Sequence, residues 1–532
     1  MRQNPSSAPL SAICMASNSN LILDEDQQLS TELDMARINL APVENSSQSS
    51  EYSLRNEKDC DNEDCQASER LADCLPIALL LPPEILSEIF LSVIEPNSAD
   101  KHAYRVSPFL FGKICSRWRE IAWSDPLLWS SIRLYLDLAK HTPTISELLD
   151  EWLRRTGRCP LTIWLGFDDR ESKFWMSNPP SDIMNQLVEH CERWENIEFF
   201  LPNAHCHEYF HAIAKVENRL PLLTSLSLRP INYDNWTQRF RLDWFGETPK
   251  LHQLSVFNYY IADMSIAWSQ LTHFNGTTLT MDECLEVLAR TSNLVHCFFR
   301  QVYEEQDEYT LPESPIFLPY LHTLHVVDAS VSWSIPLLLK LITSPALRVL
   351  KLNPSEAASG YKMVEEIESL IERSSCSLEE FEISTEDSPS SQYTTYAEYE
   401  LVRLLRLMPA LEKLFVNAGD MGWNTCLTHS ILDYMIRPHS ESTESYTQTE
   451  ILLPNLRHFS YKGLVSFTPS YLMEMLQYRA SLTYVDYRIE KQIVQLRSVK
   501  IEPIGDTADS QSVSFESVGA TARKFVDFDI IL

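Results

Sequence analysis

Glycine is scarce in this sequence, with 11 glycines among 532 residues. Sites that bind a nucleotide phosphate usually need several glycines at fixed spacing, because the backbone must approach the phosphate closely. Neither the G-x-G-x-x-G pattern nor the Walker pattern occurs, and there is no nucleophile elbow and no kinase signature. We therefore predict no cofactor and no catalytic site, and we do not expect the chain to be an enzyme.

Positive charge and long apolar runs are also in short supply. Lysine and arginine number 44 against 74 aspartates and glutamates, which gives a formal net charge of −30. This balance argues against nucleic acid or an anionic membrane as the main partner. No run of 18 apolar residues occurs, so we predict no membrane span. Residues 8–16 are too short and too polar for a secretion signal.

The twelve cysteines are scattered and form no Cys-x-x-Cys pair. Such usage is typical of reduced thiols in a cytoplasmic or nuclear protein. The densest group of metal-capable side chains is His205-Cys206-His207, with His211 one helical turn beyond. One tripeptide cannot place three ligands tetrahedrally, so we predict no metal site. Cys115 is predicted to be a core thiol without catalytic activity.

Polar and acidic residues dominate several parts of the chain. Residues 1–74 are rich in Ser, Asn, Asp and Glu, and they lack the apolar area needed to offset the entropy of ordering, so we predict disorder. Residues 303–309, 384–392 and 439–450 are acidic inserts without helical or strand periodicity. Solvated loops are the favoured interpretation, although inserts in repeat proteins often lie on the binding face.

Three short helices are predicted between residues 81 and 129. Pro82 and Pro83 suit the first turn of a helix that runs to about Ile94, with apolar residues at helical spacing. Ser107 is a predicted N-cap for one second helix that reaches Ala122, and residues 124–126 start a short third turn. A triplet this small cannot bury all of its large aromatic side chains, so part of this surface should face another domain or another protein.

These residues resemble an F-box of the kind found in large fungal F-box families. The resemblance rests on Leu-Pro-x-Glu-Ile-Leu-x-x-Ile-Phe, then Cys-x-x-Trp-Arg-x-Ile-Ala, then Asp-Pro-x-Leu-Trp. It implies that the helices bind a Skp-type adaptor, and through it a cullin–RING ubiquitin ligase, while the rest of the chain holds a protein substrate. The adaptor-binding residues it implies are Leu81, Pro82, Ile85, Ile89, Cys115, Trp118 and Trp129. The linker 95–106 is longer and more polar than the family's norm, and ordinary core helices are the alternative interpretation.

A β–α–β unit is predicted directly after these helices. Ile132, Leu134 and Leu136 alternate as in a strand, and a helix from Thr142 or Thr144 is closed by Gly157 in a left-handed cap. Residues 161–165 alternate again and predict the second strand.

A short pattern, apolar-x-x-apolar-x-apolar, then recurs along the chain at intervals of about 30 residues. Its nine copies begin at Leu223, Leu251, Leu294, Leu321, Leu347, Leu378, Leu411, Leu456 and Leu482. A degenerate copy is predicted near 271–274. The pattern resembles an irregular leucine-rich-repeat array, which implies a β–α solenoid. A doubly wound α/β domain is the alternative, but it should show glycine-rich phosphate turns.

The predicted fold class is thus α/β, with disordered residues 1–74, an F-box over 75–130, a leucine-rich-repeat-like solenoid over 131–500 and a tail over 501–532. The predicted function is substrate recognition within a Skp–cullin–F-box-type ubiquitin ligase. The alternative is a repeat scaffold without ligase function, in which the F-box-like helices only cap the solenoid. A cluster formed by Trp236, Phe240, Trp244 and Phe245 with Arg239 and Arg241 is either an interface or core packing.

Overall fold

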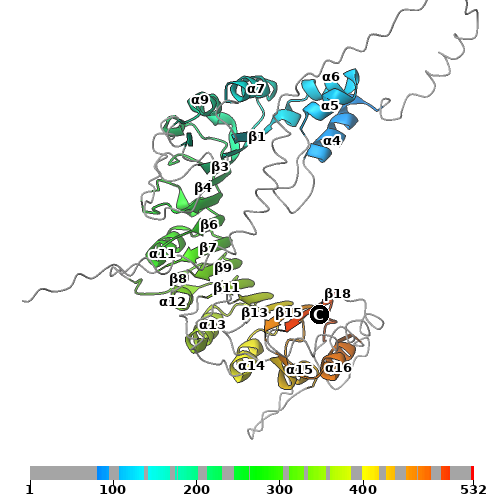
Figure 1. Ribbon diagram of the computed structural model, residues 1–532. Coiled ribbons are helices and arrows are strands. Elements are labelled where there is room, and N and C mark those ends of the chain that lie inside the picture. The colour runs from blue at the N-terminus through cyan, green and yellow to red at the C-terminus, as the bar shows by residue number, and fades with distance from the viewer. Residues whose placement is uncertain are drawn as a thin grey trace, which may run out of the picture. The chain divides into compact units, whose positions relative to one another are not determined.

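A computed structural model describes residues 81–94, 107–136, 142–167, 174–175, 178–201, 213–230, 245–262, 264–303, 311–328, 334–354, 360–384, 398–417, 427–437, 451–463, 465–480, 493–503 and 529–531. They form an α/β protein with a large, mostly parallel sheet (Figure 1). Its contacts define two compact units. The first ends at Val216 and includes residues 230–233, and the second comprises 217–229 and the chain from Asp234 onward.

Several predictions lie outside the described residues. They concern the segment 1–74, the linker 95–106, the cluster at His205, and the acidic inserts apart from Tyr303 and Ser384. The copy that begins at Leu482 and the aromatic–arginine cluster lie outside as well, except for Phe245, which is buried.

The first unit begins with four short helical segments. These are α4 (Pro83–Ile94), α5 (Phe109–Ile114), α6 (Ser116–Ser124) and the 3-10 turn η2 (Pro126–Trp129). The helix predicted from Ser107 to Ala122 is therefore two helices. They are separated at Cys115, whose backbone is extended with φ −158° and ψ 168°. The predicted boundary between residues 130 and 131 lies inside the first unit.

The β–α–β unit predicted after these helices is confirmed. The strand β1 (Ser131–Leu136) pairs in parallel with β2 (Leu161–Phe167), and α7 (Thr142–Arg155) connects them. Gly157 follows α7 with φ +55°, the left-handed conformation that glycine adopts without steric cost. The unit continues with α9 (Ser181–Glu189), η5 (Cys191–Arg193), β3 (Trp194–Leu201) and η6 (Ala214–Val216).

The second unit is a succession of parallel strands, each hydrogen-bonded to the one before it in the series. The series consists of β4 (Ser225–Pro230), β5 (Gln253–Phe257), β6 (His273–Thr277), β7 (His296–Val302), β9 (Thr323–Asp328), β11 (Val349–Asn353), β12 (Glu380–Ser384), β13 (Lys413–Asn417), β15 (His458–Gly463), β17 (Ser498–Pro503) and β18 (Asp529–Ile531). Two small sheets pair β8 (Ile316–Phe317) with β10 (Ile342–Thr343) and β14 (Leu427–Thr428) with β16 (Val465–Ser466).

Helices connect many of these strands. They are α11 (Met281–Arg290), α12 (Ser334–Lys340), α13 (Gly360–Ser374), α14 (Glu398–Arg406), α15 (His429–Tyr434) and α16 (Pro469–Ala480), and the 3-10 turn η7 (Trp268–Gln270) precedes β6. Figure 1 shows α11, α12, α13 and α14 following one another along one side of the strands. The unit therefore has one helix layer and one strand layer over most of its length.

The recurring apolar pattern marks the strands of the second unit. Eight of the nine predicted copies coincide with strands, and the degenerate copy near residue 271 is β6, so the interval of about 30 residues is one strand plus its connection. Strands with the same pattern were missed at Trp194/Ile197/Phe199 in β3 and at Leu496/Val499/Ile501 in β17. The predicted tail over 501–532 contains a short strand, β18, and β17 crosses the predicted boundary at 500.

Two buried ionisable side chains hold connections of the second unit. Glu283 accepts hydrogen bonds from the backbone N–H groups of Thr280 and Ile261, both at 3.1 Å, and forms a capping box at the start of α11. The guanidinium of Arg479, which has no exposed surface, donates to the carbonyls of Leu453, Leu456 and Val494. Burial lowers the pKa of Arg479 to about 10.

Candidate functional site

Helix α4 carries apolar residues on two faces, and only one of them is buried. Leu86, Phe90 and Ile94 face the interior with 5% exposure or less. Ile85, Ile89 and Val93 lie one residue earlier in each turn and are 47%, 40% and 41% exposed. Because both series repeat every four residues, each forms a continuous stripe along the helix. The exposed stripe is apolar surface that the described residues leave open to solvent.

Three more exposed aliphatic side chains lie on the neighbouring segments. Leu110 and Ile114 on α5 are 47% and 55% exposed, and Leu127 on η2 is 52% exposed. We call these three, together with Ile85, Ile89 and Val93, the exposed apolar set. It includes half of the twelve large apolar residues that are exposed among the described residues, although its segments are a small part of the chain. Such a concentration is typical of a protein-binding surface.

Aromatic packing underneath α4 holds the short helices together. The Phe90 and Phe111 rings are stacked with centroids 4.1 Å apart, and the Trp118 ring lies 4.9 Å from Phe90. The indole N–H of Trp118 is buried and has no acceptor in the part of the chain that the structure describes. Arg117 on α6 donates to the carbonyl of Leu81 at 2.7 Å, which fixes the entry to α4.

Cys115 is the N-cap of α6 and is half-buried, which corrects the prediction that it is a core thiol within one continuous second helix. Its Sγ accepts the backbone N–H of Trp118 at 3.4 Å, as an N-cap side chain does. The end of α5 is closed by Arg119, whose Nε donates to the carbonyl of Gly112 at 2.8 Å. Both ends at this break are therefore hydrogen-bonded, so the break is stable.

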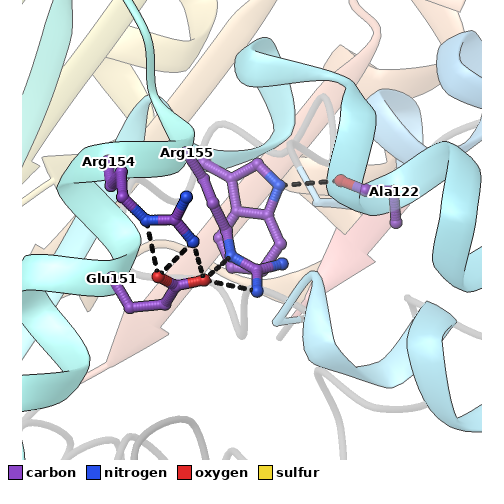
Figure 2. Close-up of polar contacts among 5 residues, drawn as sticks. Ala122, Glu151, Arg154 and Arg155 are labelled. Carbon is purple, nitrogen blue, oxygen red and sulfur yellow. Dashed lines mark hydrogen bonds and ion pairs between the residues drawn. The ribbon is translucent and has the colours of Figure 1, made fainter.

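Trp129 is a core residue, with 0% exposure. Its indole N–H donates to the carbonyl of Ala122 at 2.7 Å (Figure 2). Its own carbonyl accepts the indole N–H of Trp152 at 2.6 Å. Trp129 also begins the sequence Trp129-x-x-Ile132-x-Leu134, so it occupies the position that leucine has in the later strands. It has no exposed surface in this structure and is therefore not a member of the exposed apolar set.

Arg155 joins α7 to the aromatic core of the short helices. Its guanidinium carbon lies 4.8 Å from the Trp123 ring centroid and 4.7 Å from that of Trp129. Figure 2 shows Glu151 accepting hydrogen bonds from both Arg154 and Arg155, whose Nε atoms each lie 2.8 Å away. These hydrogen bonds lower the pKa of Glu151, with Arg154 the larger cause. The short helices thus cover the first β–α–β unit.

The seven residues that the resemblance implied fall into three groups. Ile85, Ile89 and Pro82 are exposed, Leu81, Cys115 and Trp118 are half-buried, and Trp129 is buried. Val93, Leu110, Ile114 and Leu127 were not predicted as site residues, although helical spacing places Val93 with Ile85 and Ile114 with Leu110.

The described residues contain no group of three or more His, Cys, Asp and Glu side chains placed to hold a metal ion. Among these same residues, no helix is both long enough and apolar enough to cross a membrane. Comparisons with protein-family models and with curated proteins found no match. The F-box resemblance therefore rests on the residues of this chain alone.

Proposed function

We propose that this protein is the substrate-recognition subunit of a Skp–cullin–F-box-type ubiquitin ligase. The observation that carries the proposal is the exposed apolar set, because it lies on the same short helices as the Leu-Pro-x-Glu-Ile-Leu motif. Six aliphatic side chains, each about half exposed, present roughly 400 Å² of apolar surface. Covering that surface contributes about 10 kcal/mol, which is comparable with the roughly 4–15 kcal/mol that association costs, so this set would form the apolar part of a larger interface.

The remaining chain supports the second half of the proposal. Sequential parallel strands with helices on one side resemble a leucine-rich-repeat-like solenoid, and such arrays bind proteins over extended surfaces. A receptor of this kind performs no chemistry. It holds the substrate near a loaded ubiquitin carrier and so raises the effective concentration of the reacting groups.

A second function is favoured by one specific observation. Trp129 and Trp152 share a hydrogen bond and a ring contact with centroids 5.0 Å apart, so the short helices also cover the first β–α–β unit. A non-ligase repeat scaffold needs such a cap and nothing more. A cap alone does not explain why the exposed apolar set faces solvent.

A pull-down with a purified Skp-type adaptor separates the two functions. We expect Ile85→Asp with Ile89→Asp to abolish a stoichiometric complex while circular dichroism stays unchanged, because both side chains are exposed. Leu311→Asp is the matched control, since Leu311 is 47% exposed, as Ile85 is, and lies in the second unit. A folded wild-type chain that does not bind the adaptor would leave the scaffold function.

A further inference from the structure

One face of the strands in the second unit is not covered by the helices α11 to α14, which follow the other side. Residues along these strands alternate between buried and half-buried, so every second side chain lies on this face. From β4 to β17 its ionisable side chains are Arg229, His273, His296, Arg300, His325, Lys351, Glu380, Glu382, Lys413, His458, Lys462, Lys500 and Glu502. We call this the strand face.

The strand face has the opposite charge balance from the chain as a whole. It carries six lysines and arginines against three glutamates, whereas the full sequence has 44 against 74. On the helix side, α13 alone contains Glu365, Glu366, Glu368 and Glu372. The strand face therefore differs in charge balance from the whole chain and from α13, and its excess of cations attracts anions.

The strands β7, β9 and β11 bring an aromatic pair and two cations together. The rings of Phe298 and His325 are stacked with centroids 4.1 Å apart and 7° between their planes. The guanidinium carbon of Arg300 lies 5.1 Å from the Phe298 centroid, and Lys351 is the register partner of His325 on the next strand. Burial, together with Lys351 and Arg300, lowers the pKa of His325 to about 4, so its ring is neutral at pH 7.

The neighbouring glutamates are held by lysines. Lys351 lies 2.6 Å from a carboxylate oxygen of Glu380 and 3.1 Å from one of Glu382, and Lys413 lies 2.9 Å from Glu380. Two lysines thus share Glu380. With Arg300 included, cations exceed anions on this part of the strand face.

We propose that the strand face binds an extended acidic segment of another protein, with a carboxylate on Arg300 and an apolar side chain on Phe298 and His325, while Lys351 and Lys413 offset the charge of Glu380 and Glu382 beside it. The role of the strand face as a substrate site rests on the function proposed above, whereas its binding of an acidic segment does not depend on that function. The Debye length is about 8 Å at physiological ionic strength, so a short acidic segment is attracted locally. A long polyanion such as nucleic acid would be repelled by the acidic remainder of the chain.

Fluorescence anisotropy with a labelled peptide of alternating Asp and Glu around one Phe tests this proposal. We expect salt-sensitive binding, and no binding of the same peptide with Asn and Gln in place of the acids. Arg300→Ala with Lys351→Ala should weaken binding by about tenfold or more, since the carboxylate contact to Arg300 is lost and Glu380 and Glu382 lose a lysine that neutralises them. Arg154→Ala, an exposed charge on α7 of the first unit, should change it less than about twofold.

A cycle of substitutions tests the aromatic contact. Phe298→Ala should weaken binding of the Phe-containing peptide but leave the affinity for a Ser-containing version unchanged, because only the Phe-containing peptide has a side chain that can lie on the Phe298 ring. A phosphoserine peptide that binds while the Asp/Glu peptide does not would overturn the assignment to carboxylates. Equal binding of acidic and neutral peptides, or no effect of the double substitution, would overturn the site.

The adaptor is absent from this assay, so its result is independent of the ligase proposal. Ile85→Asp in the first unit should leave peptide affinity unchanged. A chain that binds the peptide but not the adaptor would be an acidic-peptide-binding scaffold. A chain that binds the adaptor but not the peptide would overturn the strand-face proposal and leave the ligase proposal standing.

Discussion

The short helices of the first unit and the strands of the second unit differ in how far their apolar side chains are exposed. Along β11 and β12, Leu350, Leu352, Phe381 and Ile383 are 2% exposed or less, and the residues between them are polar or half-buried. On α4, apolar residues occupy both faces and three of them are at least 40% exposed. The apolar side chains of β11 and β12 therefore stabilise the fold, whereas three of the seven large apolar side chains on α4 are available to a partner.

The largest expected effect compares a buried apolar side chain of the second unit with an exposed one on α4. Phe381→Ala removes a fully buried ring and should lower the free energy of unfolding by about 3–5 kcal/mol. Ile89→Ala, on the exposed stripe, should cost less than about 1 kcal/mol, because little buried area is lost. Urea unfolding followed by circular dichroism measures both. Equal losses would show that α4 buries both stripes.

The next effect concerns a buried cap in the second unit. Glu283→Ala should destabilise this unit by about 2–4 kcal/mol, because the N–H groups of Thr280 and Ile261 lose their acceptors in a buried setting. Hydrogen exchange at these two amides should speed up together. Unchanged exchange would mean that another group accepts both hydrogen bonds.

A smaller effect is expected on lowering the pH. Because the pKa of His325 in the folded protein is about 4 and that of unfolded histidine is about 6.5, only the unfolded state takes up a proton between these values. The histidine's contribution is therefore complete above about pH 6.5 and is lost as the pH falls toward 4, with roughly 1–2 kcal/mol lost after allowance for partial exposure.

His325→Phe keeps the ring stack and should flatten this part of the pH dependence of unfolding. Residues 83–94 and 109–129 contain no histidine, so these helices have no counterpart to this effect. The same pH slope in wild type and variant would show that His325 is as accessible to protons when folded as when unfolded.

The smallest expected effect is at the break between α5 and α6. Cys115→Ala removes the acceptor for the Trp118 N–H and should cost about 0.5–1 kcal/mol. Cys115→Ser should retain or slightly increase stability, since serine is a preferred N-cap. Thermal unfolding of the two variants compares them directly. A stability loss that is larger for Ser than for Ala would mean that the thiol serves as an apolar contact.

Much of the strand order could be predicted from the sequence because each strand carries its own local signal. A leucine, an apolar residue three positions later and another two positions after that recur because one side of every strand faces the helices. The copies at Trp194 and Leu496 have the same spacing and could have been found. The F-box resemblance and the repeat pattern overlap at Trp129, and the sequence does not show that its side chain is fully buried; its role at an adaptor stays a prediction.

The sequence cannot decide which stripe of α4 faces inward, because Ile85/Ile89/Val93 and Leu86/Phe90/Ile94 have the same spacing. Tertiary contacts with Phe111 and Trp118 decide it. The strand face was also beyond sequence reasoning. Its cations are far apart in the chain, and only the register of parallel strands brings Arg300 and Lys351 to one region.

Hydrogen exchange of the full chain, with and without a purified Skp-type adaptor, tests the central claim most directly. We predict that exchange slows in Pro83–Ile94, Phe109–Ile114 and the segment up to Trp129, and stays unchanged in β4 to β17. Protection confined to the strands of the second unit, or no change anywhere at saturating adaptor, would contradict the assignment of the exposed apolar set as the docking surface.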